Sequence, residues 1–198
     1  SNNRPNKMID KNNITAVILS GGRSSRMQGE DKGLILLNDK PLISYVADVV
    51  NSKVVRLLIS ANRNIDAYQK YGEVISDELS DFQGPLAGIV KAMSVVSTPY
   101  LLVLPCDSPL VNEIVIDRLI QCMTDKDMDI CVAGDGVRIH PTFALIKTSL
   151  KDNLLAFLDS GERKLGLWIE QNDFQKVDFS DQPKVFINLN NPQDFDKI

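Results

Sequence analysis

A glycine-rich, positively charged stretch offers the clearest chemistry in this sequence. Residues 19–33 read LSGGRSSRMQGEDKG, and Gly21 and Gly22 permit a tight turn that lets a phosphate approach the backbone closely. Exposed N–H groups in such a turn form an anion site, to which Arg26 and Lys32 add positive charge. The stretch therefore predicts a cradle for a triphosphate. The alternative is a flexible surface loop whose charges are simply solvated.

Two better-known phosphate loops do not fit this stretch. A Walker A loop requires Lys followed by Ser or Thr, whereas Lys32 is followed by Gly33. The GxGxxG pattern of dinucleotide-binding proteins is also absent. A P-loop NTPase is therefore disfavoured.

A stiff acidic corner lies elsewhere in the chain. Residues 105–109 read PCDSP, so Asp107 is held between two prolines. Mg²⁺ is usually bound by one or two carboxylates together with substrate phosphate oxygens, which makes Asp107 a candidate metal ligand. The alternative is an ordinary Asp-Ser-Pro turn. We expect Cys106 to be a small packed residue rather than a nucleophile, because the adjacent carboxylate would raise its pKa.

The elements that must position these residues alternate along the chain. Continuous apolar runs, typical of strands covered on both faces, predict strands at residues 14–19, 54–59, 74–75, 100–104, 130–133, 142–146 and 185–187. Periodic apolar patterns predict helices at residues 42–50, 85–96, 112–123, 150–158 and 164–170. This alternation indicates an α/β fold, a three-layer sandwich with a mainly parallel, Rossmann-like sheet.

Ligands of such sheets bind beyond the carboxyl ends of the strands. The loops after Leu19, Ile59, Ile75 and Leu104 should therefore lie along one edge of the sheet. These loops carry the glycine-rich stretch and the acidic corner, so the sequence predicts one shared site.

The composition excludes several classes of protein. A net charge of −4 without a basic block argues against a general nucleic-acid binder. Three cysteines without a CxxC argue against a disulfide framework and a cysteine-based zinc site. No apolar run approaches membrane-spanning length and no secretory signal is visible, so we expect a cytoplasmic protein that does not enter a membrane. We expect residues 1–13 to be a disordered N-terminal segment or an artificial addition, and residues 14–198 to form a single domain.

Several motifs together resemble the molybdenum cofactor guanylyltransferases, a family of nucleotidyltransferases. That family opens with a strand, LAGG, a basic run ending in Arg-Met, and DKG. This chain has LSGG at 19–22, then Arg26-Met27, then DKG at 31–33. PCD at 105–107 matches the family's magnesium-binding Asp, and GPLAG at 84–88 follows a matching Asp. The resemblance implies a nucleotidyltransferase-type sheet and an Mg²⁺-dependent enzyme that transfers GMP from GTP to the terminal phosphate of molybdopterin, releasing pyrophosphate.

The resemblance also implies roles for individual residues. The catalytic residues would be Arg26 and Lys32, which contact phosphates, and Asp107, which binds the metal. The nucleotide would be held by Leu19, Ser20, Gly21, Gly22, Lys32, Ser60, Asn62, Asp77, Gly84, Pro85 and Asp107. Ser60 stands where the family has Asn, and Asn62 would carry part of that role. We expect Lys32 and Asp107 to face each other across one triphosphate pocket.

Three further segments resemble family stretches linked to the pterin side or to the metal. They are HPT at 140–142, SGERK at 160–164 and NLNNP at 188–192. The resemblance makes His140, Arg163 and Lys164 candidates for molybdopterin binding and Asn190 a candidate for ordering the metal or its waters. The alternatives are a structural histidine, a solvated charged face and a simple Asn-Pro turn.

Other readings of the same residues remain open. They are a CTP-dependent molybdopterin cytidylyltransferase, a sugar-phosphate nucleotidyltransferase, and a non-catalytic GTP-binding protein of cofactor assembly. Gly21-Gly22 in place of Ala-Gly favours guanine by resemblance. The expected partners are GTP and molybdopterin, with cofactor-assembly or molybdoenzyme-maturation proteins as further candidates.

Overall fold

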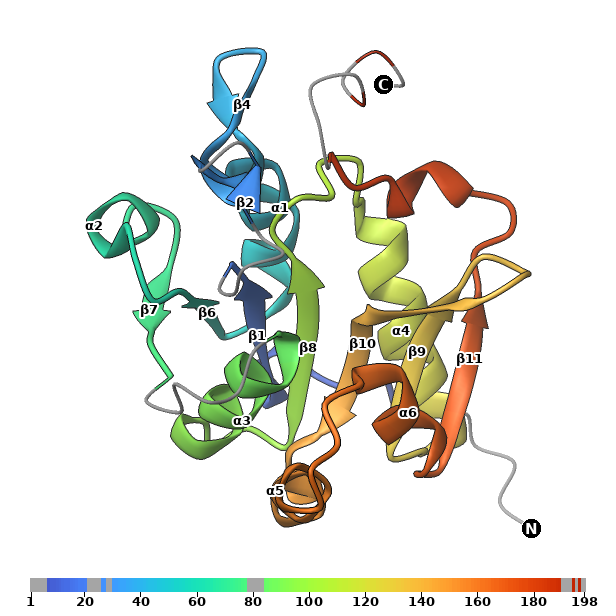
Figure 1. The fold of residues 1–198 in the computed structure, drawn as a ribbon. Helices are drawn as coiled ribbons and strands as arrows, with labels where there is room; N and C mark the ends of the chain where they lie inside the picture. The colour runs from blue at the N-terminus through green and yellow to red at the C-terminus, as the bar shows by residue number, and fades with distance from the viewer. Residues whose placement is uncertain are drawn as a thin grey trace, which may run out of the picture.

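The structure is a computed structural model that describes residues 7–20, 26–27, 30–77, 84–189, 194 and 196 of the chain. Arg26, Met27 and Glu30 are described through their strand pairing alone. Within these residues, a central sheet is covered by helices on both faces (Figure 1).

The central sheet has seven strands in the order β11-β9-β10-β8-β1-β6-β7. Its strands are β1 (Ile14–Leu19), β6 (Arg56–Ser60), β7 (Glu73–Ile75), β8 (Tyr100–Pro105), β9 (Ile130–Gly134), β10 (Ile139–Lys147) and β11 (Phe174–Asp178). β10 runs antiparallel to both β8 and β9, and the other pairs are parallel. The prediction of a mainly parallel sheet is confirmed.

The two faces of the sheet bury separate apolar cores, because successive side chains of a strand point to opposite faces. Ile18 of β1 packs in one core with α1 (Leu42–Val50) and α4 (Glu113–Lys126). Val17 packs in the other core with α3 (Pro85–Val95), α5 (Lys151–Asp159) and α6 (Leu165–Glu170). The three-layer α/β prediction is therefore confirmed.

Short elements follow the ends of β1, β6 and β8; Figure 1 shows β2 and β4 near the top and α2 at the left. They are the ladders β2 (Arg26–Met27) with β3 (Glu30–Asp31) and β4 (Leu36–Leu37) with β5 (Lys40–Pro41), the 3₁₀ turn η3 (Lys32–Leu34) and the helix α2 (Ile65–Tyr68). None of these was expected from the sequence, because two to four residues carry too little periodicity to detect.

One expected strand is wrong and one strand was missed. The strand expected at 185–187 is the 3₁₀ turn η6 (Pro183–Phe186), which begins at a proline that has no N–H to offer a sheet. β11 was missed because only Val177 of its five residues is buried, so its apolar pattern is weak.

The described structure begins nearer the N-terminus than expected. The turn η1 (Lys11–Asn13) is capped by Asp10, and the Ile9 N–H donates to Oγ1 of Thr124 at 3.2 Å. Residues 7–13 are therefore part of the fold, and only residues 1–6 of the segment expected to be disordered lie outside the described residues.

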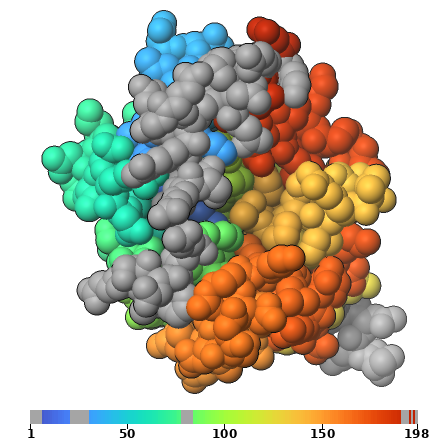
Figure 2. Space-filling model, viewed as in Figure 1, coloured from blue at the N-terminus to red at the C-terminus, as the bar shows by residue number. Residues whose placement is uncertain are grey.

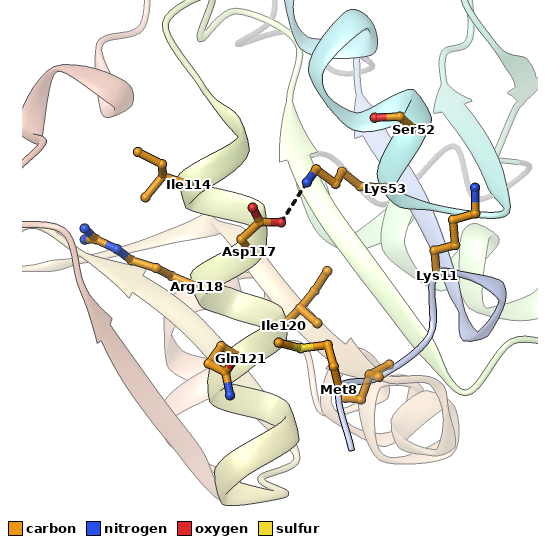
Figure 3. Close-up of a pocket in the computed structure, with 10 residues that line it drawn as sticks. Met8, Lys11, Ser52, Lys53, Ile114, Asp117, Arg118, Ile120 and Gln121 are labelled. Carbon is orange, nitrogen blue, oxygen red and sulfur yellow. Dashed lines mark hydrogen bonds and ion pairs between the residues drawn. The ribbon is translucent and has the colours of Figure 1, made fainter. Parts of the chain in front are cut away.

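This segment also borders a groove of about 610 Å³ on the α4 side of the molecule (Figure 3). It is lined by Met8, Ile9, Lys11, Ser52, Lys53 and one side of α4. Lys53 Nζ lies 3.0 Å from Oδ1 of Asp117. The groove includes none of the residues predicted to bind nucleotide or pterin. In the part of the chain that the structure describes, no helix is both long and apolar enough to span a bilayer.

Candidate active site

The site begins where four parallel strands end side by side. In the ladder, Leu19 at the end of β1 pairs with Ser60 of β6 and with Pro105 of β8, and Ser60 pairs with Ile75 of β7. The loops after these strands therefore meet at one edge of the sheet, as the sequence predicted.

Lys32 and Asp107 face each other at this edge. Nζ of Lys32 lies 3.8 Å from Oδ2 of Asp107, and the two side chains are only 11% and 13% exposed. Gly33 makes this approach possible, because a Cβ built on it would lie 3.2 Å from Cβ of Cys106. The two charged groups lie next to each other, as expected, and a triphosphate pocket at this place stays a prediction.

Burial governs the protonation of the residues around this pair. It raises the pKa of Asp107 above its ordinary value, and the positive charge of Lys32 offsets that rise only in part. Burial also raises the pKa of the neighbouring Cys106 thiol, and the charge of Asp107 adds to the effect. Cys106 is a free, buried thiol, in line with the expected packed residue rather than a nucleophile.

Asp107 has the chemistry of a magnesium ligand. Its carboxylate is largely withdrawn from water and incompletely compensated by one ammonium group, so a second cation would relieve it. No group of three or more His, Cys, Asp or Glu gathers within the described residues. Mg²⁺ does not require such a cage, because substrate phosphates supply much of its coordination.

Asp31, the neighbour of Lys32, is a buried carboxylate that sequence reasoning missed as a site residue. It accepts hydrogen bonds from Nε of Arg63, from Nδ2 of Asn64 at 2.8 Å, and from the Tyr68 hydroxyl at 3.4 Å. The sequence places Asp31 in the DKG motif but gives no sign that its partners stand in the segment before α2 and in α2 itself.

Asn62 and Asp77 join the loops after β6 and β7. Nδ2 of Asn62 donates to Oδ2 of Asp77 at 3.0 Å, and the Asp77 N–H donates to Oδ1 of Asn62 at 3.1 Å. This reciprocal pair orients the Asp77 carboxylate at the edge of the sheet. The sequence suggested each residue separately but not their contact.

Ser60 and Leu19 lie directly beneath the start of α3. A Cβ built on Gly88 would lie 2.6 Å from Oγ of Ser60 and 3.0 Å from Cδ2 of Leu19. Only glycine at this position lets the helix approach the strand ends so closely. Gly84 precedes α3 with φ +96°, and Pro85 takes the first helical position, where its missing N–H costs nothing.

His140 is held at one ring nitrogen and on one ring face. Its Nε2 lies 2.8 Å from Oδ2 of Asp135, and its ring stacks on Phe186 with centroids 4.0 Å apart. Asp135 also accepts the backbone N–H groups of Val137 and Arg138, and these bonds hold its pKa well below the ordinary value. The geometry is that of a structural histidine, the alternative that the sequence left open.

The segments HPT and SGERK come together on the α5–α6 face. A Cβ built on Gly166 would lie 3.4 Å from Cγ of Pro141, so the start of α6 adjoins the residue after His140. Arg163 and Lys164 precede α6 and are exposed, and Nη1 of Arg163 donates to the carbonyl oxygen of Leu158 at 2.9 Å. Figure 2 shows α5 and α6 in orange as the lower front surface, beside the yellow β9–β10 hairpin.

The C-terminal segment returns to Asp107. Oγ of Ser108 donates to Oδ1 of Asn188 at 2.5 Å, and the Leu189 N–H donates to the carbonyl oxygen of Asp107 at 3.2 Å. Asn188 thus ties this segment to the acidic corner, a contact that the sequence did not predict. Asn190 lies outside the described residues, as do Gly21, Gly22 and the side chain of Arg26.

Known proteins share both the sequence and the fold of this chain. Residues 16–175 match the model of the MobA-like NTP transferase domain. The chain is 46% identical to a molybdenum cofactor guanylyltransferase of Shewanella piezotolerans over 91% of this chain and 89% of that protein. It is 45% identical to the Shewanella loihica protein of the same name, over 91% and 92%.

The fold recurs in a solved molybdopterin-guanine dinucleotide biosynthesis protein A from Archaeoglobus fulgidus. That structure superposes with a TM-score of 0.75 at 23% identity, over 93% of this chain and 95% of the other. A Methanothermobacter nucleotidyl transferase superposes with a TM-score of 0.72 at 18% identity, over 93% and 94%. On its sequence match the chain belongs to the MobA-like NTP transferase family, among the molybdenum cofactor guanylyltransferases.

Proposed function

We propose that this protein transfers GMP from GTP to the terminal phosphate of molybdopterin and releases pyrophosphate. The observation that carries the proposal is the Lys32–Asp107 pair, 3.8 Å apart and largely buried where four strand ends meet. The curated relatives named molybdenum cofactor guanylyltransferase support the choice of substrates.

The reaction needs positioning and charge neutralisation more than covalent help from the protein. A phosphate oxygen of molybdopterin forms a bond to the α-phosphorus of GTP, the bond from that phosphorus to the bridging oxygen breaks, and pyrophosphate leaves in line. Lys32 neutralises negative charge on the leaving group. Its interaction is strong because the side chain is 11% exposed and lies in a medium of low dielectric. Arg26 is proposed to share this role.

Asp107 is proposed to hold the magnesium ion. When bound there, Mg²⁺ would supply charge neutralisation to the triphosphate. Asp107 itself contributes a carboxylate that lies 3.8 Å from Nζ of Lys32, and the Leu189 N–H holds its backbone by donating to the Asp107 carbonyl oxygen.

Asp77 is proposed to read the base. Guanine presents N–H donors at N1 and N2, and a carboxylate oriented by Asn62 can accept them. Leu19, Ser20, Ser60 and the start of α3 form the adjoining floor. For the second substrate, exposed Arg163 and Lys164 are proposed to bind the molybdopterin phosphate, which a planar guanidinium suits.

The decisive experiment incubates the protein with molybdopterin, Mg²⁺ and GTP and measures pyrophosphate. CTP and ATP in parallel reactions separate a guanylyltransferase from a cytidylyltransferase. Binding of GTP without pyrophosphate release would instead identify a non-catalytic GTP-binding protein.

A pair of variants tests the metal assignment. Asp107→Ala should abolish transfer while the circular dichroism spectrum stays that of the wild type. Asp181→Ala, which removes an exposed carboxylate bonded to Arg118, is the matched control and should stay active. Retained transfer in Asp107→Ala would reject the role of Asp107.

A further inference from the structure

A second buried charge stands next to Lys32 and has no part in the chemistry described above. The side chain of Asp31 is 1% exposed. It occupies the position that would cap η3, yet it makes no hydrogen bond to that turn. A buried carboxylate is costly unless it is hydrogen-bonded, so its actual partners decide where this part of the chain lies.

Those partners come from the segment before α2. Arg63 donates through Nε to one carboxylate oxygen, and Asn64 donates through Nδ2 to the other at 2.8 Å. Asn64 adopts a left-handed conformation with φ 54° and ψ 35°, which asparagine tolerates. The amide of Asn64 bonds Asp31 and makes no bond to cap α2. Asp31 and Asn64 therefore cap neither η3 nor α2, and their side chains bond each other across the chain instead.

The backbone of Asp31 adjoins the backbone of both residues proposed to contact phosphates. It pairs with Arg26 in the β2–β3 ladder and directly precedes Lys32 in the chain. Anchoring Asp31 therefore fixes the backbone from which Arg26 and Lys32 extend.

The neighbouring glycine is enclosed from two sides. A Cβ built on Gly33 would lie 3.0 Å from the Tyr68 hydroxyl and 3.2 Å from Cβ of Cys106. The Tyr68 hydroxyl is also 3.4 Å from Oδ2 of Asp31. Residues 31–33 are thus held between α2 and the end of β8, where Asp107 follows.

We infer that Asp31 and Arg63 form a positioning pair for GMP transfer. The pair holds the backbone of residues 31–33 so that Lys32 faces Asp107, and it acts through Lys32 and Arg26. This inference rests on the proposed function. Arg63 and Asn64 lie between β6 and α2 and belong to no strand of the central sheet, so changing Arg63 alters no strand.

Arg63 is the better residue to change, because its side chain is 28% exposed while that of Asp31 is 1% exposed. Arg63→Ala should lower kcat for pyrophosphate release about 100-fold, the scale of a small misplacement of a catalytic group, with a much smaller change in KM for GTP. Arg63→Lys should recover part of the loss. Added guanidinium should raise kcat of Arg63→Ala but not of the wild type.

A double-mutant cycle separates positioning from general damage. In a Lys32→Ala background the loss of kcat caused by Arg63→Ala should shrink from about 100-fold to below about 10-fold. The reason is that Arg63 acts mainly through Lys32, whose charge is already removed. Arg56→Ala is the control. It removes a guanidinium bonded to Glu73 at 2.8 and 2.6 Å at the opposite end of β6, and kcat should not change.

The outcomes separate the two proposals. An active wild type with undiminished kcat in Arg63→Ala overturns the positioning pair alone, as does an equal loss in both backgrounds of the cycle. A wild type that releases no pyrophosphate overturns the proposed function and the pair with it. Should Arg63→Ala fail to fold, Arg63→Lys decides: a kcat loss that shrinks in the Lys32→Ala background supports the pair, and an unchanged kcat rejects it.

Discussion

Removing the charge of Lys32 tests the electrostatic argument for the site most directly. Two unit charges 3.8 Å apart, the distance between Lys32 Nζ and Asp107 Oδ2, interact by about 1 kcal/mol in water and about 4 kcal/mol at an effective dielectric of 20. The 11% exposure of Lys32 places it nearer the second value. A phosphate oxygen at a similar distance would gain as much, and about 1.4 kcal/mol corresponds to a tenfold rate. Lys32→Ala should therefore lower kcat about 10²- to 10³-fold.

The assay is steady-state pyrophosphate release with saturating molybdopterin and varied GTP, so that kcat and KM are obtained separately. Lys32→Arg keeps the charge but changes its shape, and should fall between the wild type and Lys32→Ala. Lys53→Ala is the matched control, because Lys53 pairs with Asp117 at 3.0 Å in the groove of Figure 3 and should leave kcat unchanged.

Two results would refute the reasoning about Lys32. One is a kcat for Lys32→Ala within about threefold of the wild type, which would mean less than about 0.7 kcal/mol of charge stabilisation. The other is an equal loss in Lys53→Ala, which would show that the assay responds to total charge rather than to the site.

Three further predictions concern stability. In metal-free protein, Asp107→Asn should melt at a higher temperature than the wild type at pH 7. Because burial raises the pKa of Asp107, its ionised carboxylate destabilises the fold once the pH rises above the unfolded-state pKa. The difference in melting temperature between Asp107→Asn and the wild type should therefore vanish near pH 3. Gly88→Ala should cost about 1–3 kcal/mol in urea unfolding, since its Cβ would lie 2.6 Å from Oγ of Ser60, and Ser60→Ala should recover part of it; strict additivity would contradict the contact. His140→Ala should lower the free energy of unfolding, because it removes the ring that stacks on Phe186 with centroids 4.0 Å apart, and unchanged unfolding would argue against a structural role.

The sequence predicted the parts of the fold that depend on continuous apolar burial. The expected bounds of β1 and α1 match the structure, because their apolar runs are long and follow one period. α4 begins directly after Asn112, the first residue of the helix predicted at 112–123, and the Asn112 side chain accepts the Val115 N–H. β11 escaped notice because a half-exposed edge strand needs only one buried residue on its inner face.

For the site, the sequence predicted which residues gather but not how they are held. The strand-end rule brought Lys32 and Asp107 to one edge because it depends only on strand order. The bonds from Arg63 and Asn64 to Asp31 depend on where a four-residue helix and a short ladder come to lie. No local sequence pattern encodes that placement, so such contacts can be identified only in the three-dimensional structure.

The two carboxylates that neighbour Lys32, Asp31 in the chain and Asp107 in space, differ in how far the protein itself satisfies them. Asp31 is satisfied by donors within the protein, and that satisfaction fixes the backbone beside it. The Asp107 side chain is 13% exposed, and its pKa remains raised despite Lys32, so its charge is not fully compensated by the folded chain. Fully neutralising Asp107 inside the protein would make the fold more stable and would remove its attraction for a cation. The remaining imbalance is what a cation and a triphosphate together can relieve, and a stabilised but inactive Asp107→Asn would be its direct signature.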